Sequence, residues 1–212
     1  MALRGVVGRG AVLLVVVSTL TGFLTGLASL ALALTVTEFN DGLLRAASCL
    51  SLALLIAAPA AGGVVSGLIA EYVAGEVRGH GTDAVIRAIL LKEGFIRARA
   101  PLAKLAATVS TVGSGGSGGL VGPMVHVGAG ISSALARAFG LGGRYVRVLA
   151  LSGVSAGVSG VLKAPVAGAL AGLEILYRGP GLERGALIPS LTASLASYLT
   201  VSALLGPHPL LY

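Results

Sequence analysis

Residues 113–126 read Gly-Ser-Gly-Gly-Ser-Gly-Gly-Leu-Val-Gly-Pro-Met-Val-His, a glycine-dense turn between two apolar segments. Pro123 lies where the second segment is expected to begin a helix, because proline is favoured in the first helical turn, where its missing N–H is not needed. The beginning of a helix carries unpaired N–H donors and roughly half of a positive elementary charge. This stretch therefore predicts an anion site, located either in water or in a membrane.

The composition favours the membrane. Of the 212 residues, 55% are apolar and 11% are charged, with a mean hydropathy of +0.95, whereas soluble domains contain about 25% charged residues. Residues 11–34 are apolar for longer than the core of a signal peptide and lack an obvious cleavage site, so we expect them to span the bilayer. The single Cys49 excludes an internal disulfide and a cysteine metal cluster.

The pattern of apolar segments predicts an all-α integral membrane protein with about seven tilted or broken spans and one short re-entrant helix. The expected spans cover residues 11–34, 46–70, 101–112, 123–139, 143–162, 164–177 and 186–205, and the re-entrant helix covers 82–92. Glu38, Asp41 and Arg45 predict a polar loop between the first two spans. The small-residue pairs Gly153/Gly157 and Gly168/Gly172 predict close helix contacts.

The basic residues predict the topology. With the N-terminus inside and seven crossings, all of the fifteen Lys and Arg except Arg45 and Lys163 fall on the inner side, as the positive-inside rule requires. The C-terminus then lies outside, and we expect a multi-pass protein of the cell membrane with one membrane domain, residues 1–212, and no cytoplasmic regulatory domain. The net charge of +7 is attributed to this topology, so no nucleic-acid partner is expected.

Three interpretations of the glycine turn compete. Gly113, Gly115 and Gly118 match a dinucleotide-binding fingerprint, but no acidic residue follows for about fifty positions, where a ribose-binding carboxylate belongs about twenty residues on. A phosphate-binding P-loop requires a lysine after the glycines, and none is present. An anion cradle formed by broken helices inside the membrane fits the hydropathy and needs no acidic residue.

These residues resemble the CLC family of chloride channels and proton-coupled anion antiporters. Residues 113–117 followed by 119–123 resemble the family's Gly-Ser-Gly-Gly-Ser run and Gly-Arg-Glu-Gly-Pro motif. Residues 163–168, Lys-Ala-Pro-Val-Ala-Gly, resemble its Asn-Ala-Pro-Leu-Ala-Gly segment, and residues 79–83, Gly-His-Gly-Thr-Asp, more loosely resemble its Gly-Ser-Gly-Ile-Pro chloride motif. The resemblance covers nearly the whole chain, and the order of the motifs makes it specific.

The resemblance implies anion transport rather than catalysis, with chloride or a similar anion as the transported ligand and no cofactor or metal. It also implies that backbone N–H groups of two segments face the anion. The implied anion-binding residues are Gly79, His80, Gly81, Thr82, Gly119, Leu120, Val121, Gly122, Pro123 and Met124.

The departures from the family pattern concern proton chemistry. Val121 occupies the position of the gating glutamate, Leu120 that of the arginine before it, and Ile175 that of the inner proton-transfer glutamate. Neither Val121 nor Ile175 can carry a proton, so the resemblance and the chemistry together predict passive, uncoupled anion conduction. The alternative is a non-conducting protein, such as a membrane assembly subunit.

The remaining polar residues allow more than one role. His80 stands where the family most often has serine, and could donate an N–H to the anion with a response to pH, or be a buried histidine bonded to a backbone carbonyl. His126 and His208 are expected to be structural. Glu174 is either a functional intramembrane residue or a structural partner, and Asp83 is expected to cap the short helix.

The resemblance extends only to the first of the family's two inverted repeats. An isolated half would leave helix starts and irregular backbone facing lipid, which is costly. We therefore expect a separately encoded second half or a dual-topology copy of the same chain as partner. A truncated product is the third possibility.

Overall fold

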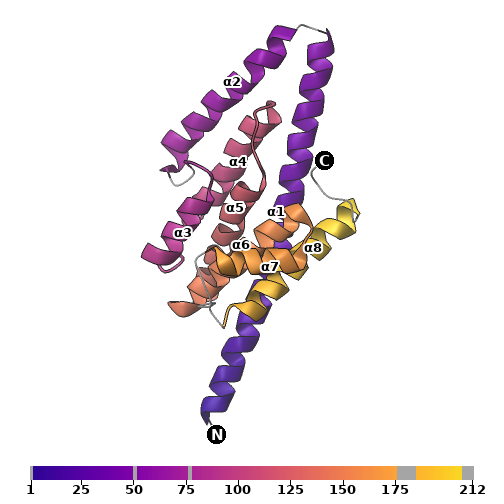
Figure 1. Ribbon diagram of the computed structural model, residues 1–212. Coiled ribbons are helices and arrows are strands. Elements are labelled where there is room, and N and C mark those ends of the chain that lie inside the picture. Colours follow the sequence, from indigo (N-terminus) through magenta and orange to yellow (C-terminus); the bar gives the residue numbers. More distant parts are fainter. Residues whose placement is uncertain (1, 50–51, 76–77, 176–184, 207–212) are drawn as a thin grey trace.

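The computed structural model describes residues 2–49, 52–75, 78–175 and 185–206, and within these ranges it is all-α, as predicted (Figure 1). The elements are α1 (Ala2–Cys49), α2 (Leu52–Leu68), the π-helical turn η1 (Ile69–Val73), α3 (Thr82–Leu91), α4 (Arg99–Gly113), α5 (Val121–Ala138), α6 (Arg144–Leu162), α7 (Pro165–Glu174) and α8 (Leu187–Leu205). Among the described residues, four helical stretches are long and apolar enough to cross a membrane: Gly10–Ala46, Ile56–Val73, Arg144–Leu162 and Leu187–Leu205.

The first helix corrects one prediction. The polar loop expected at Glu38, Asp41 and Arg45 is wrong, because α1 continues through all three residues as one helix of 48 residues. Their side chains are exposed, and polar side chains on the outside of a helix do not end it when no proline follows. At 1.5 Å per residue α1 is about 70 Å long, more than twice the thickness of a hydrocarbon core of about 30 Å.

Helix α6 is the centre of the fold. Every residue from 148 to 161 is buried, and α1, α5, α7 and α8 all pack against this helix. A Cβ atom placed on Gly153 would lie 2.2 Å from the carbonyl oxygen of Gly128 in α5, and one on Gly157 would lie 2.3 Å from the carbonyl oxygen of Met124. A Cβ atom on Gly168 of α7 would lie 2.8 Å from Cβ of Ser159, and one on Gly172 would lie 2.9 Å from the Leu151 carbonyl oxygen, both in α6, so the predicted contacts at both glycine pairs are confirmed.

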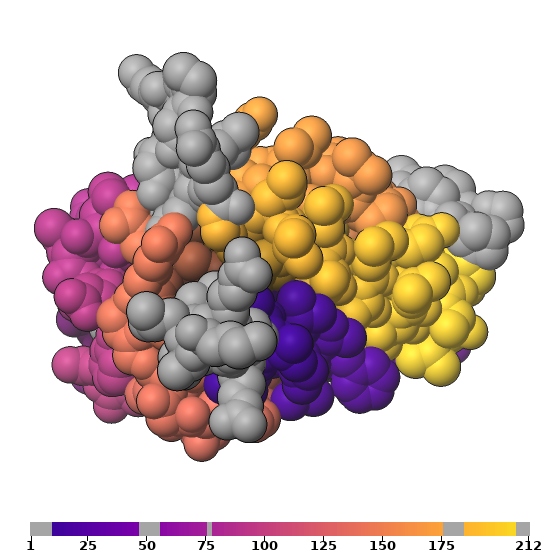
Figure 2. All heavy atoms as spheres, turned by 90° about the horizontal axis from the view of Figure 1, so that it is seen from below, coloured from indigo at the N-terminus to yellow at the C-terminus, as the bar shows by residue number. Residues whose placement is uncertain are grey.

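Small and hydroxyl-bearing residues join α1, α6 and α8. A Cβ atom on Gly22 of α1 would lie 2.2 Å from the carbonyl oxygen of Ala193 in α8. The Ser159 hydroxyl donates to the carbonyl oxygen of Ser194 at 2.9 Å, and the Ser197 hydroxyl donates to that of Ala156 at 2.8 Å. Seen from the N-terminal end, α8 in yellow lies directly beside α1 in indigo (Figure 2). Such hydrogen bonds hold helices together where lipid supplies no hydrophobic driving force.

The α2–α4 region forms one side of the molecule (Figure 1). Helix α2 is largely unburied and packs on α4 through Gly62, whose Cβ would lie 2.2 Å from the Ser110 carbonyl oxygen. The loop between α3 and α4 is tied to the end of α5. The Ile96 N–H donates to the Ser133 hydroxyl at 3.0 Å, and the Arg137 guanidinium donates to the Ile96 carbonyl oxygen at 2.9 Å. These contacts fix the loop that follows α3 against the end of α5.

We predict that Gly153→Ala lowers the melting temperature of the protein in detergent micelles, whereas Gly142→Ala does not. The new methyl group at position 153 meets the α5 backbone and has to separate two packed helices, at a cost of about 2–3 kcal/mol. Gly142 lies in the loop before α6, with nothing within 4 Å of an added Cβ, so its substitution is expected to stay within about 0.5 kcal/mol. Equal melting temperatures for the two variants would contradict the close α5–α6 contact.

Candidate functional site

The beginnings of α3 and α5 meet at one junction. A Cβ atom on Gly122 would lie 2.1 Å from Nδ1 of His80 and 2.6 Å from the His80 carbonyl oxygen, and one on Gly81 would lie 2.8 Å from the Gly122 carbonyl oxygen. The turn before α3 reaches this position because Gly79 and Gly81 have φ angles of 78° and 101°, which favour glycine. The structure thus brings together the two segments that the resemblance implied, and we call their contact the α3–α5 junction.

The first turn of α5 presents few free donors. The helix begins at Val121, two residues before the expected start at 123. Pro123 has no N–H, and the Met124 N–H donates to the Leu120 carbonyl oxygen at 3.1 Å. The N–H groups of Val121 and Gly122 precede this first helical hydrogen bond. Pro123 and Met124 therefore shape the turn, whereas the N–H groups of Val121 and Gly122 have no acceptor within the helix.

The first turn of α3 is similar. Gly81 is its N-cap residue, and the Val85 N–H donates to the Gly81 carbonyl oxygen at 3.2 Å. The N–H groups of Thr82, Asp83 and Ala84 precede this hydrogen bond. The expected cap at Asp83 is wrong, because the cap position is Gly81 and no side chain caps the helix. Asp83 instead lies in the first turn, where its charge faces the positive end of the helix.

Val121 and Ile175, which stand where the family has glutamates, both contact the apolar core. Leu120 is buried, and the half-buried Val121 packs against the two largest core clusters. Ile175, at the end of α7, packs against one of these, the cluster that contains Val85 and Leu173. Both positions thus contact the same apolar cluster. Glu174, the neighbouring acidic residue, is exposed.

Lys104 is a site residue that the sequence reasoning missed. Its side chain is 6% exposed, and its ammonium group donates to the Gly79 carbonyl oxygen at 2.7 Å. A Cβ atom on Gly81 would lie 3.3 Å from Cε of Lys104. The sequence does indicate a role for Lys104, because a charged residue within an apolar membrane segment is by default a candidate functional residue. The topology predicted from the sequence instead assigns Lys104 to the inner-side cations.

The two histidines near the junction differ. His80 is exposed, with Nδ1 3.5 Å from the Thr82 hydroxyl, which rules out the buried structural histidine considered above. His126 is buried one helical turn beyond Gly122, in keeping with the structural role expected of it. His208 lies outside the described residues.

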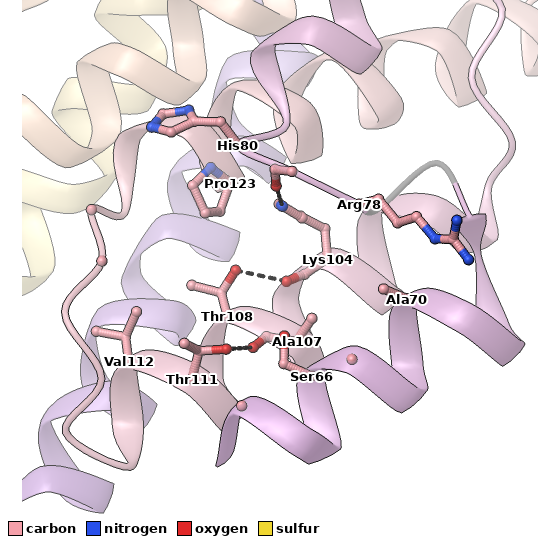
Figure 3. A pocket seen from close by; sticks show the side chains of 15 residues that line it. Ser66, Ala70, Arg78, His80, Lys104, Ala107, Thr108, Thr111, Val112 and Pro123 are labelled. Atoms are coloured by element: carbon pink, nitrogen blue, oxygen red, sulfur yellow. Dashed lines mark hydrogen bonds between the residues drawn. The ribbon is translucent and has the colours of Figure 1, made fainter. Parts of the chain in front are cut away.

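Two cavities flank the α3–α5 junction and share Arg78 and Gly79. The first, which we call the α2–α4 cavity, has a volume of about 510 Å³, and none of the described residues that line it is acidic (Figure 3). Its polar lining residues are Ser66, Arg78, His80, Lys104, Thr108 and Thr111. The second, the α3 cavity, has a volume of about 560 Å³ and is lined by Arg78, Arg87 and Lys92, with Asp83 as its acidic member. Cations and helix N-termini together favour anions at this place.

The structure is that of an all-helical membrane protein with broken helices, whose beginnings meet between two cavities that cations line. Residues 62–212 match the family model described as voltage gated chloride channel. Because this match covers most of the chain, the protein belongs to the CLC family of chloride channels and antiporters.

Individual relatives agree with this assignment. The chain is 27% identical over 171 residues to the ClcB-like protein of Ralstonia nicotianae, covering 79% of this chain and 39% of that protein. It is similar to the solved structure of a CLC-type fluoride/proton antiporter, with 25% identity and a TM-score of 0.79 over 93% of this chain and 48% of the other. A slow cyanobacterial Cl⁻/H⁺ antiporter shares the fold, with 22% identity, a TM-score of 0.74 and coverage of 90% and 46%. The chain spans about half the length of these structures.

We predict that Gly122→Ala weakens halide binding to the purified protein by about tenfold or more, since the loss of a hydrogen bond to a charged group costs about 1.5–3 kcal/mol. The added methyl group would overlap the His80 ring and push the residue 79–81 turn away from α5. Gly142→Ala is the control, because nothing lies within 4 Å of a Cβ atom at Gly142 and this residue is not among the implied anion-binding residues. Calorimetric titration with chloride measures both variants, and equal affinities would contradict the junction as the binding site.

Proposed function

We propose that the chain forms one half of a CLC-type pathway for chloride or a similar monovalent anion, and that the movement of the anion is passive and not coupled to protons. The observation that carries this proposal is the α3–α5 junction itself. Two helix beginnings with unpaired N–H donors meet there, with a cation-lined cavity on either side.

In the proposed mechanism, the anion exchanges water molecules of its hydration shell for hydrogen bonds from backbone N–H groups. An anion that enters from the α3 cavity gives up water and accepts hydrogen bonds from N–H groups at the first turns of α3 and α5, chiefly those of Thr82, Val121 and Gly122. The positive ends of the two helices and the nearby Lys104 ammonium favour its charge, and the low surrounding dielectric strengthens each contact. The anion then leaves into the α2–α4 cavity.

We infer the absence of proton coupling from the side chains at the two positions where the family has its proton-carrying glutamates. Coupling requires groups that bind and release protons along the anion path. Val121 stands at the junction and Ile175 lies on the same apolar cluster, and neither side chain can be protonated. The carboxylate that competes with chloride elsewhere in the family is therefore absent from this path.

A partner completes the proposed pathway. The chain spans about half the length of its solved relatives, and His80, Gly118 and Gly119 are exposed beside the junction. Unpaired N–H groups exposed to lipid are costly, so another polypeptide must cover them. We propose a separately encoded CLC-like half, with a second copy of this chain in the opposite orientation as the other arrangement.

The direct test is halide flux in liposomes that contain the chain, alone or together with a CLC-like second half. We predict that an imposed chloride gradient dissipates with net charge movement and without uphill movement of protons, as reported by a pH dye inside the liposomes. Absence of flux in both preparations contradicts anion transport. Uphill proton movement contradicts only the uncoupled part of the proposal.

We predict that Val121→Glu introduces a block of flux that acid relieves. An ionised carboxylate at the first turn of α5 competes with the anion for the same N–H donors and lowers flux about tenfold at neutral pH, and protonation removes that charge as the pH falls toward the usual range of a glutamate. Val121→Gln is the control, because it has the same size without the charge. If Glu and Gln give the same flux at every pH, position 121 does not face the path, as expected for a non-conducting assembly subunit.

A further inference from the structure

A third cavity lies where α4 ends between α1 and α2, and we call it the α1–α2 cavity (Figure 1). Its volume of about 520 Å³ falls within the range of roughly 300–1,000 Å³ that is typical of sites for small organic ligands. It shares no lining residue with the two cavities that flank the α3–α5 junction. The proposed passage of an anion therefore does not use it.

The walls of the α1–α2 cavity are largely apolar. Phe39, Gly42 and Leu43 of α1 and Ala58 of α2 line it, and the four-residue spacing of Phe39 and Leu43 places both on one face of α1. Nothing lies within 4 Å of a Cβ atom placed on Gly42. The cavity thus has space for an apolar group, and Phe39 adds an aromatic ring of the kind on which organic cations pack.

The polar features of this cavity favour a positive charge. The exposed Glu38 is its acidic lining residue. The Ser114 hydroxyl donates its hydrogen to the Thr111 carbonyl oxygen at 2.9 Å, which leaves the hydroxyl oxygen as an acceptor. Gly113 is the last residue of α4, and the C-terminal end of a helix carries about half of a negative elementary charge.

The charge of this cavity is opposite to that of the other two. None of the described residues that line it is basic, whereas cations line both cavities beside the junction. Glu38 and the end of α4 also lie near each other, since a Cβ atom on Gly113 would lie 3.0 Å from Cβ of Phe39, the next residue after Glu38. A ligand with one positive group can therefore meet both features.

We infer that the α1–α2 cavity binds a small organic ammonium ion. The ammonium group lies near Glu38 and the end of α4, and the apolar body lies along Phe39 and Gly42. Gly113 and Ser114 begin the glycine turn that leads to α5, so the bound ion contacts that turn. Binding does not rest on the proposed function, because the cavity lies outside the anion path.

The test uses the full chain, purified in a non-ionic detergent, with 4-fluorophenethylammonium as the probe, ¹⁹F NMR as the readout and micelles alone as the blank. The amine of this probe resembles that of lysine and is charged at neutral pH. We expect saturable binding. 4-Fluorophenethyl alcohol, which has a similar shape without the charge, should bind about tenfold more weakly, in line with the worth of a charged hydrogen bond. Equal binding of the two probes, or no saturable binding of the ammonium probe, overturns the inference.

Two variants of α1 test the charge. Glu38→Gln should weaken binding of the ammonium probe by about fivefold, the size expected for an ion pair with an exposed carboxylate. Asp41→Asn is the matched control, because it removes the same charge from an exposed residue three positions along α1 that does not line the cavity. Undiminished binding to Glu38→Gln, or equal weakening by both substitutions, overturns the inference.

A second pair of variants locates the apolar body. Gly42→Leu fills the cavity from its open wall and should weaken binding of the ammonium probe by about tenfold or more, because the apolar body loses its place. Gly67→Leu is the control, since nothing lies within 4 Å of a Cβ atom at Gly67 and this residue does not line the α1–α2 cavity. Undiminished binding to Gly42→Leu, or an equal loss in Gly67→Leu, contradicts this location.

Discussion

Close approach of the α5 and α6 backbones is the constraint on which the candidate site depends. Lipid supplies no hydrophobic force between helices, so van der Waals contact between closely packed backbones has to hold them. At Gly128 and Gly153 each helix occupies the space that a side chain of the other would need, and Gly157 brings α6 equally close to the carbonyl group of Met124. The first turn of α5 is thereby fixed on a buried helix. With α5 fixed in this way, the residue 79–81 turn can pack against Gly122, because Gly122 has no side chain in the space that His80 occupies.

Hydrogen bonds between buried polar groups fix the position of α4. The Lys104 ammonium group donates to the carbonyl oxygen of Gly79, 25 residues earlier in the chain, and thus ties the turn before α3 to α4. The serine hydroxyls between α6 and α8 act in the same way. A buried polar group without a partner is costly in this medium. These pairs therefore fix where the helices sit as well as contributing to their stability.

Much of this arrangement could be predicted from glycine, proline and apolar length, because these act locally. The starts and ends of α3, α4, α6 and α8 lie within about two residues of the expected ranges, in keeping with the usual uncertainty of helix ends. The loop expected at Glu38 failed because a polar side chain can point away from a helix that continues. The role of Lys104 could not be derived from local pattern, since the carbonyl group it binds comes from another element. Meeting of the two glycine segments was foreseen only through the family resemblance.

The apolar residues at the junction have a consequence for how such a site would work. A carboxylate attached to the first turn of α5 would compete with the anion within the same molecule, so that occupancy of the site by the anion would depend on protonation of the carboxylate. Val121 leaves the same N–H donors uncontested and uses its side chain to bridge two core clusters. In the proposed pathway, no acidic side chain therefore occupies the N–H groups, and these donors are always available to the anion. Any control of access then has to come from the cavities that flank the junction, whose lining includes the cations Arg78, Arg87, Lys92 and Lys104.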